Sequence, residues 1–228
     1  MLTINLQDKK YKLPEELTPS QWQTVMSWDF EDPKHYAHIV NAVTHAPIDL
    51  LKEVEPENLV LPVAFIIQLL NERQTVEGTK PFDQILFGEF IDLDVYLNMG
   101  IEKHLEDIAE VLAPGKKINA AQACQLADEF SNFRIHIFRQ YKVLFGLDDK
   151  DFEGSDEDAE IDRMQIARAW YRTIVELADW DLLKIDQVVD QPLKKTLNFM
   201  ALRKQAQLEE NEKELNKKRQ YDLQANRR

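Results

Sequence analysis

Glycine is scarce in this chain, and the scarcity narrows the possible folds more than any other sequence feature. Six of the 228 residues are glycine, and they stand singly along the sequence. All-β folds with many hairpins and α/β enzymes with phosphate-binding turns both consume glycine, because it adopts positive φ without strain. No G-x-G-x-x-G or G-x-x-x-x-G-K-[ST] pattern occurs, so we expect neither a dinucleotide-binding nor a P-loop enzyme. The sequence instead predicts a mainly α fold: a multi-helix bundle with a short N-terminal β-hairpin and a long charged C-terminal helix.

Residues 1–17 carry the only convincing β signal and are predicted to form a hairpin arm. Polar and apolar residues alternate from Thr3 to Leu6 and again from Tyr11 to Leu13, with a polar turn between them and Pro14 behind. A hairpin of two strands is only marginally stable in water. We therefore expect it to pack on the helical body or on a partner chain.

Helix caps and apolar spacing divide the remainder of the chain. Thr18-Pro19-Ser20-Gln21 combines an N-cap, a proline in the first turn and a capping-box glutamine. We expect a helical core over residues 18–147, an acidic connector over 148–160, a continuation of the core over 161–202 and a charged helical or disordered tail over 203–228. The helix that contains the apolar run 59–70 begins at either Pro56 or Pro62.

Two segments of this core combine helical apolar spacing with aromatic residues. Residues 119–146 are predicted to form one long helix through Gly146, because apolar residues keep helical spacing over more than six turns after a capping Asn119. Their stretch 130–141 interleaves aromatic and basic residues, as base-stacking surfaces do, but the spacing favours core aromatics. Residues 161–177 form a second amphipathic pattern, in which Trp170 and Tyr171 are both assigned to the apolar face.

The tail beyond Arg203 is strongly polar, with few apolar positions. They are Leu208, Leu215, Tyr221 and Leu223, and the first two lie seven residues apart. An isolated helix of this composition would fray in water. The tail is therefore predicted either to be partly disordered or to lie against another subunit through one narrow apolar seam, and these four residues are the candidate partner-binding residues.

Charge and cysteine content indicate a soluble protein of a reducing compartment. The formal net charge is −13, so the long-range field repels nucleic acid and anionic membranes, and neither is expected as a partner. The apolar run 59–70 is too short to cross a bilayer. Cys124 is the only cysteine, which excludes an internal disulfide framework, and the N-terminus lacks the pattern of a secretory signal.

One acidic segment resembles a calcium-binding loop. Asp149, Asp151, Glu153 and Glu160 fall in register with the D-x-[DN]-x-[DN]-G-x₅-E pattern between two expected helices. Glu153 is longer than the pattern prefers, and Asp156 stands where an aliphatic residue is usual. The same carboxylates are suited to the N-terminus of the following helix. A single Ca²⁺ site is thus the alternative to a plain acidic connector, and no other cofactor is expected.

No constellation of residues indicates catalysis. His35 and His38 are three apart on an expected helix, but no cysteine or H-E-x-x-H pattern accompanies them. Cys124 lies mid-helix without a basic sequence neighbour and is expected to be buried and inert. Carboxylate pairs such as Asp92/Asp94 and Asp179/Asp181 are common in so acidic a chain. We therefore expect a protein that is not an enzyme.

Three stretches resemble proteins encoded in the structural modules of tailed bacteriophages. They are the N-terminal hairpin running into Pro14-Glu-Glu-Leu-Thr-Pro-Ser-Gln-Trp22, the run Phe87-Gly-Glu-Phe-Ile-Asp92, and Pro192-Leu193 with Asn198-Phe-Met-Ala-Leu-Arg203. The resemblance is to tail assembly chaperones and to baseplate or hub assembly proteins, and it covers about a third of the chain. It implies an acidic, helical, non-enzymatic protein that binds tail, baseplate or tape-measure proteins. Such a protein would act in the host cytoplasm during assembly or remain as a minor virion component, either alone or as an oligomer.

Overall fold

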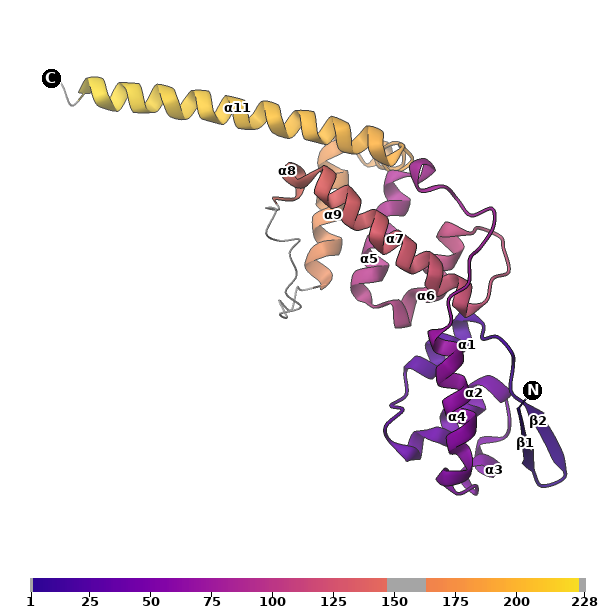
Figure 1. Cartoon of the computed structure of the whole chain (residues 1–228). Coiled ribbons are helices and arrows are strands. Elements are labelled where there is room, and N and C mark those ends of the chain that lie inside the picture. The colour runs from indigo at the N-terminus through magenta and orange to yellow at the C-terminus, as the bar shows by residue number, and fades with distance from the viewer. Residues whose placement is uncertain (1, 147–162, 226–228) are drawn as a thin grey trace. The chain divides into compact units, whose positions relative to one another are not determined.

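The structure is a computed structural model that describes residues 2–146 and 163–225, and it confirms a mainly α fold with an N-terminal hairpin (Figure 1). The chain forms two compact units. Unit 1 contains Met1–Pro81 and Asp92–Asn132, and unit 2 contains Phe82–Ile91 and Phe133–Arg228. Chain order therefore alternates between the units. Helices α5 (Phe87–Met99) and α7 (Ala120–Gln140) each contribute residues to both.

The predicted hairpin is present in unit 1. Strand β1 (Thr3–Leu6) pairs antiparallel with β2 (Lys9–Lys12), with Ile4 opposite Tyr11. The side chains of Ile4 and Leu6 point to one face and are buried in the unit 1 core. The hairpin thus packs on its own helical body, which is one of the two arrangements that its marginal stability allowed.

Unit 1 is built from short helices, several of which begin with a capping residue or a proline. They are α1 (Pro19–Met26), the 3₁₀ turn η1 (Pro33–His35), α2 (Tyr36–Thr44), α3 (Ile48–Lys52), α4 (Pro56–Asn71) and α6 (Ile101–Leu112). The capping box at Thr18 is confirmed: the Gln21 amide donates to Thr18 Oγ1 at 3.1 Å, and the Thr18 amide donates to Gln21 Oε1 at 3.0 Å. Helix α4 begins at Pro56, so Pro62 lies buried inside it.

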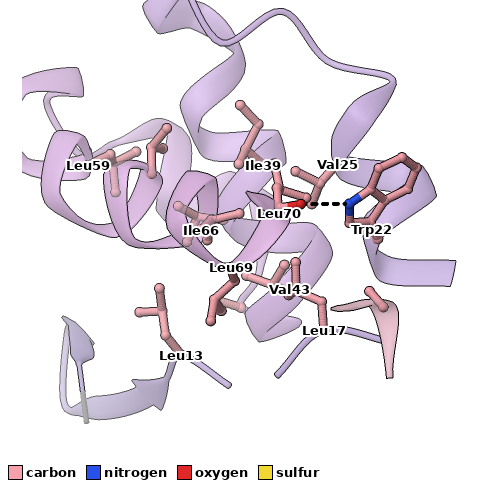
Figure 2. Packing of buried hydrophobic residues seen from close by; sticks show 14 of the residues in the cluster. Leu13, Leu17, Trp22, Val25, Ile39, Val43, Leu59, Ile66, Leu69 and Leu70 are labelled. Carbon is pink, nitrogen blue, oxygen red and sulfur yellow. Dashed lines mark hydrogen bonds between the residues drawn. The ribbon is translucent and has the colours of Figure 1, made fainter. Parts of the chain in front are cut away.

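Leucine, isoleucine and valine from several elements form the core of unit 1 (Figure 2). Leu13, Ile39 and Ile66 are almost completely buried there. Trp22 is also buried, and its indole Nε1 donates a hydrogen bond to the Leu70 carbonyl at 3.4 Å (Figure 2). This bond satisfies the one polar atom that the tryptophan brings into the core.

Unit 2 packs around a cluster of aromatic rings. Phe90 is completely buried, and its ring meets those of Phe133, Phe138 and Trp170 edge-on at centroid distances of 6.0–6.5 Å. Edge-to-face packing at this range is favourable for aromatic pairs. The aromatic stretch of α7 is therefore confirmed as core on this side. The other elements of the unit are η2 (Phe82–Gln84), α8 (Lys142–Phe145), α9 (Arg163–Leu177), η4 (Leu182–Lys184), α10 (Ile185–Val189) and α11 (Leu193–Ala225).

The prediction of one helix through Gly146 is wrong, because α7 ends at Gln140. Tyr141 leaves the helical region with φ −112° and ψ 31° and separates α7 from α8. Its buried ring reaches α11, where the Tyr141 hydroxyl donates to Asn198 Oδ1 at 2.8 Å. Burial raises the pKa of Tyr141. A tertiary contact that the local sequence does not contain thus accompanies the break.

A short backbone bridge anchors the start of α11 in unit 2. The Phe87 amide donates to the Gln191 carbonyl at 2.8 Å, and the Leu193 amide donates to the Ile85 carbonyl at 3.0 Å. Gly88 permits this approach, because a Cβ at that position would lie 2.9 Å from the Cβ of Val189. The first turn of α11 is thereby held against the first turn of α5.

Candidate functional site

The candidate site is the far part of α11, whose near part belongs to the core of unit 2. Leu193 and Leu197, in the first two turns, are buried. From Leu202 to Arg219, every residue is exposed. Helix α11 runs unbroken to Ala225 as a 33-residue helix, about 50 Å long at 1.5 Å per residue. Helix α11 therefore includes the tail as far as Ala225.

Leu208 and Leu215 continue the face of α11 that packs into the core. Leu215 follows Leu197 by 18 residues, which is five complete turns, and Leu208 lies within about 20° of the same direction. The two side chains retain 48% and 49% of their exposure. Two of the predicted partner-binding residues are thus brought onto one face, here called the α11 stripe: Leu208 and Leu215.

The other two predicted partner-binding residues are on the helix but outside the described side chains. Tyr221 and Leu223 lie within the backbone of α11, which ends at Ala225. Around the stripe, the helix surface is charged and polar, and Gln205 Nε2 donates to Glu209 Oε1 at 3.3 Å. Contacts one turn apart of this kind add only a few tenths of a kcal/mol to helix stability.

The candidate calcium ligands Asp149, Asp151, Glu153 and Glu160 lie outside the described residues, so their arrangement is not part of the structure. Within residues 2–146 and 163–225, no three histidine, cysteine or acidic side chains come together as a metal site would require. His35 and His38 both contact the ring of Trp28, at centroid distances of 5.3 and 4.5 Å. The predicted i, i+3 histidine pair therefore flanks an aromatic ring.

The carboxylate pairs are placed in different environments. Asp94 is buried, with 1% exposure, and Asn98 Nδ2 donates to its Oδ1 at 3.3 Å. Asp92 and Asp179 are exposed, and Asp181 is half-buried. The Asp181 carboxylate accepts the Leu183 amide at 3.0 Å and so serves as the N-cap of η4.

Cys124 has the environment of a packed thiol. It is buried in the unit 1 core, as the sequence predicted. Burial raises the pKa of Cys124 to about 11, while the nearby Arg73 lowers it in part. Arg73 lies 51 positions away in the sequence, so inspecting sequence neighbours missed this basic group. Since the thiolate is the reactive form, the thiol is unreactive near neutral pH.

Sequence analysis missed an exposed apolar surface in unit 2. Tyr171, assigned to the core face of its helix, is 62% exposed, so that assignment is wrong, whereas Trp170 is buried as expected. Trp180 retains 77% of its exposure. The adjacent pair 170–171 cannot point to the same side, because neighbouring residues lie about 100° apart on a helix. Other large apolar side chains left exposed in unit 2 include Leu182, Leu183, Phe199 and Leu202.

Comparisons with known proteins found no match to this chain. No family model matches the chain, and no curated protein or solved structure matches it. Among the described helices, none has both the length and the apolar character needed to span a bilayer.

Proposed function

We propose that this chain is a non-enzymatic assembly protein that binds other structural proteins through the distal part of α11. The observation that supports the proposal is the α11 stripe, in which the core-facing side of the helix continues as Leu208 and Leu215. Helices this polar gain most of their stability in proteins from packing of an apolar face. A partner helix lying along the stripe would supply that packing.

The energy available from the stripe implies a specific and extended contact. Fully burying a leucine side chain contributes about 1.5–3 kcal/mol, so covering the remaining half of both leucines contributes about 1.5–3 kcal/mol in total. This is less than the entropic cost of association. The partner must therefore also contact the charged flanks of α11, where Lys204 and Glu212, each four residues from Leu208 and about 40° from it around the helix, are suited to interhelical ion pairs.

The resemblance to tailed-phage structural modules supports a partner class. We propose tail, baseplate or tape-measure proteins as the partners, bound during assembly in the host cytoplasm or in the virion. The hairpin offers a second contact, because β1 and β2 form a two-stranded sheet, and each strand has an outer edge at which a partner strand could add.

Removing the distal part of α11 tests the proposal. A chain truncated after Leu202 retains the buried residues Leu193 and Leu197 and should remain folded by circular dichroism. The full chain, co-expressed in turn with tail, baseplate and tape-measure proteins from its own genome, should co-purify with one of them, and the truncated chain should not. The double variant Leu208→Glu/Leu215→Glu should also lose the partner.

A matched control separates the stripe from exposed leucines in general. Leu61, on α4 of unit 1, is 73% exposed, and Leu61→Glu should retain the partner. The proposal fails if the truncated chain unfolds, if it still binds, or if Leu61→Glu lowers binding as much as the stripe variant does.

A further inference from the structure

A second apolar face lies on α9 in unit 2, turned away from the face that packs in the core. Trp170, Ile174 and Ala178 face the interior and are buried. Tyr171 and Val175 lie about 100° around the helix from Trp170 and Ile174. Tyr171 is largely exposed, and Val175 is partly so. Helix α9 and its C-terminal cap thus carry two apolar faces, and the described residues of its unit bury only one of them.

The second face forms a shallow groove. Its volume is about 410 Å³, and its lining residues are Ala167, Arg168, Tyr171, Arg172, Val175 and Trp180. All come from α9 and the turn that follows it. We call this surface the α9 groove.

Trp180 is placed at the end of the groove by a strained turn. Helix α9 ends in a Schellman arrangement, in which the Trp180 amide donates to the Val175 carbonyl at 3.0 Å and the Asp179 amide to the Glu176 carbonyl at 3.4 Å. Asp179 and Trp180 both have positive φ, at 53° and 60°. Glycine is usual at such a cap, and a bulky residue with positive φ is an outlier. Strain of this kind is concentrated at functional sites.

The charges in the groove favour an acidic ligand. Its two charged lining residues, Arg168 and Arg172, are both basic, although the chain as a whole carries −13. Arg172 Nε contacts Glu176 Oε1 at 2.9 Å, yet the arginine side chain remains 77% exposed. Asp179 and Asp181 flank Trp180 in the chain, but neither lines the groove.

A neighbouring groove of unit 2 repeats this combination of apolar walls and basic charge. It lies at the end of α9 and against α10 and α11, with a volume of about 330 Å³. Leu177, Val188 and Phe199 supply apolar walls, and its charged lining residues are Lys184 and Lys195. Positive charge beside apolar walls is therefore found at both grooves.

We infer that the α9 groove binds an acidic amphipathic segment of a partner protein. Trp180 and Tyr171 take up apolar side chains of that segment, while Arg168 and Arg172 pair with its carboxylates. Tryptophan, tyrosine and arginine are the residue types that dominate binding energy at protein interfaces. An anionic membrane is disfavoured by the net charge of −13. This surface is separate from the α11 stripe.

Selection from a displayed library of random 16-residue peptides on the full-length protein tests the inference. Enriched peptides should be net acidic and carry two or more large apolar residues. Their affinity, measured by fluorescence anisotropy, should fall at least tenfold in Trp180→Ala and in Arg168→Glu/Arg172→Glu, and it should weaken as salt is raised. Leu208→Glu/Leu215→Glu and Leu61→Glu should bind these peptides like the unaltered chain, which separates this test from that of the proposed function.

Several results would overturn the inference. They are the absence of enriched peptides, enrichment of neutral or basic ones, and undiminished binding to both variants of the groove. Sedimentation of the protein with phosphatidylserine vesicles, abolished in Trp180→Ala, would identify a membrane surface instead. A dimer of the full chain that Trp180→Ala converts to a monomer would identify a second copy as the occupant. Because Arg168 is exposed, its variant remains informative if Trp180→Ala misfolds.

Discussion

The same substitution at two places along α11 should have very different effects on stability. Leu197 is 0% exposed in the core of unit 2. Leu197→Ala should therefore lower the free energy of unfolding by about 2–5 kcal/mol, the range for truncating a buried leucine. Leu208→Ala/Leu215→Ala should change it by less than about 0.5 kcal/mol, as expected for exposed positions. Alanine also favours the helix slightly more than leucine does.

Urea unfolding followed by far-ultraviolet circular dichroism measures both changes. Protein concentration should be varied, because self-association through the stripe would make the unfolding midpoint depend on it. A loss of 2 kcal/mol or more in Leu208→Ala/Leu215→Ala, independent of concentration, would show that the stripe packs within the chain. That result would refute the reasoning that leaves the stripe for a partner.

Three further outcomes follow from individual sites. Asp179→Gly should raise the free energy of unfolding, measured by urea titration, by about 1 kcal/mol, because glycine adopts the positive φ of that position without strain. A decrease would show that the aspartate side chain is stabilising. Burial raises the pKa of Cys124 from 9.0 to about 11, so the unfolded chain loses this proton at lower pH than the folded chain does. The contribution of this thiol to the free energy of unfolding should thus be constant below pH 9 and decline between pH 9 and 11. Iodoacetamide at pH 9 should therefore react with Cys124 far faster in guanidinium than in the native protein. Equal reaction rates would disprove the burial of the thiol. Calorimetry should show no heat at millimolar Ca²⁺, with Glu160→Gln behaving like the unaltered chain, and a saturable heat lost in that variant would establish the calcium-loop alternative.

Local signals predicted the helices well where a cap or a break is encoded by adjacent residues. The Thr18 capping box is an example, because both of its hydrogen bonds join residues three apart. Asn119 provides another: the Gln122 amide donates to Asn119 Oδ1 at 2.9 Å, and α7 begins at the next residue. The end of α7 could not be predicted in this way, because the Tyr141 hydroxyl that follows it donates a hydrogen bond to Asn198, 57 positions further along the chain.

The candidate site was predicted in part for a similar reason. Leu208 and Leu215 stand out in the sequence because few apolar residues surround them. The α9 groove does not stand out, since Tyr171 and Val175 fit a helical apolar pattern as well as Trp170 and Ile174 do. A pattern shows that a residue is apolar and roughly which way it points, but it does not show whether another segment covers it.

What the sequence by itself determined is the local conformation: scarce glycine, capping residues and apolar spacing specify helices through interactions between residues a few positions apart. Only the tertiary structure decided that Phe82–Ile91 joins the C-terminal unit and that Trp180 remains exposed on a strained turn. Which segments cover one another depends on contacts between parts of the chain that are distant in sequence. Burial is a property of such contacts, so no reading of neighbouring residues can assign it.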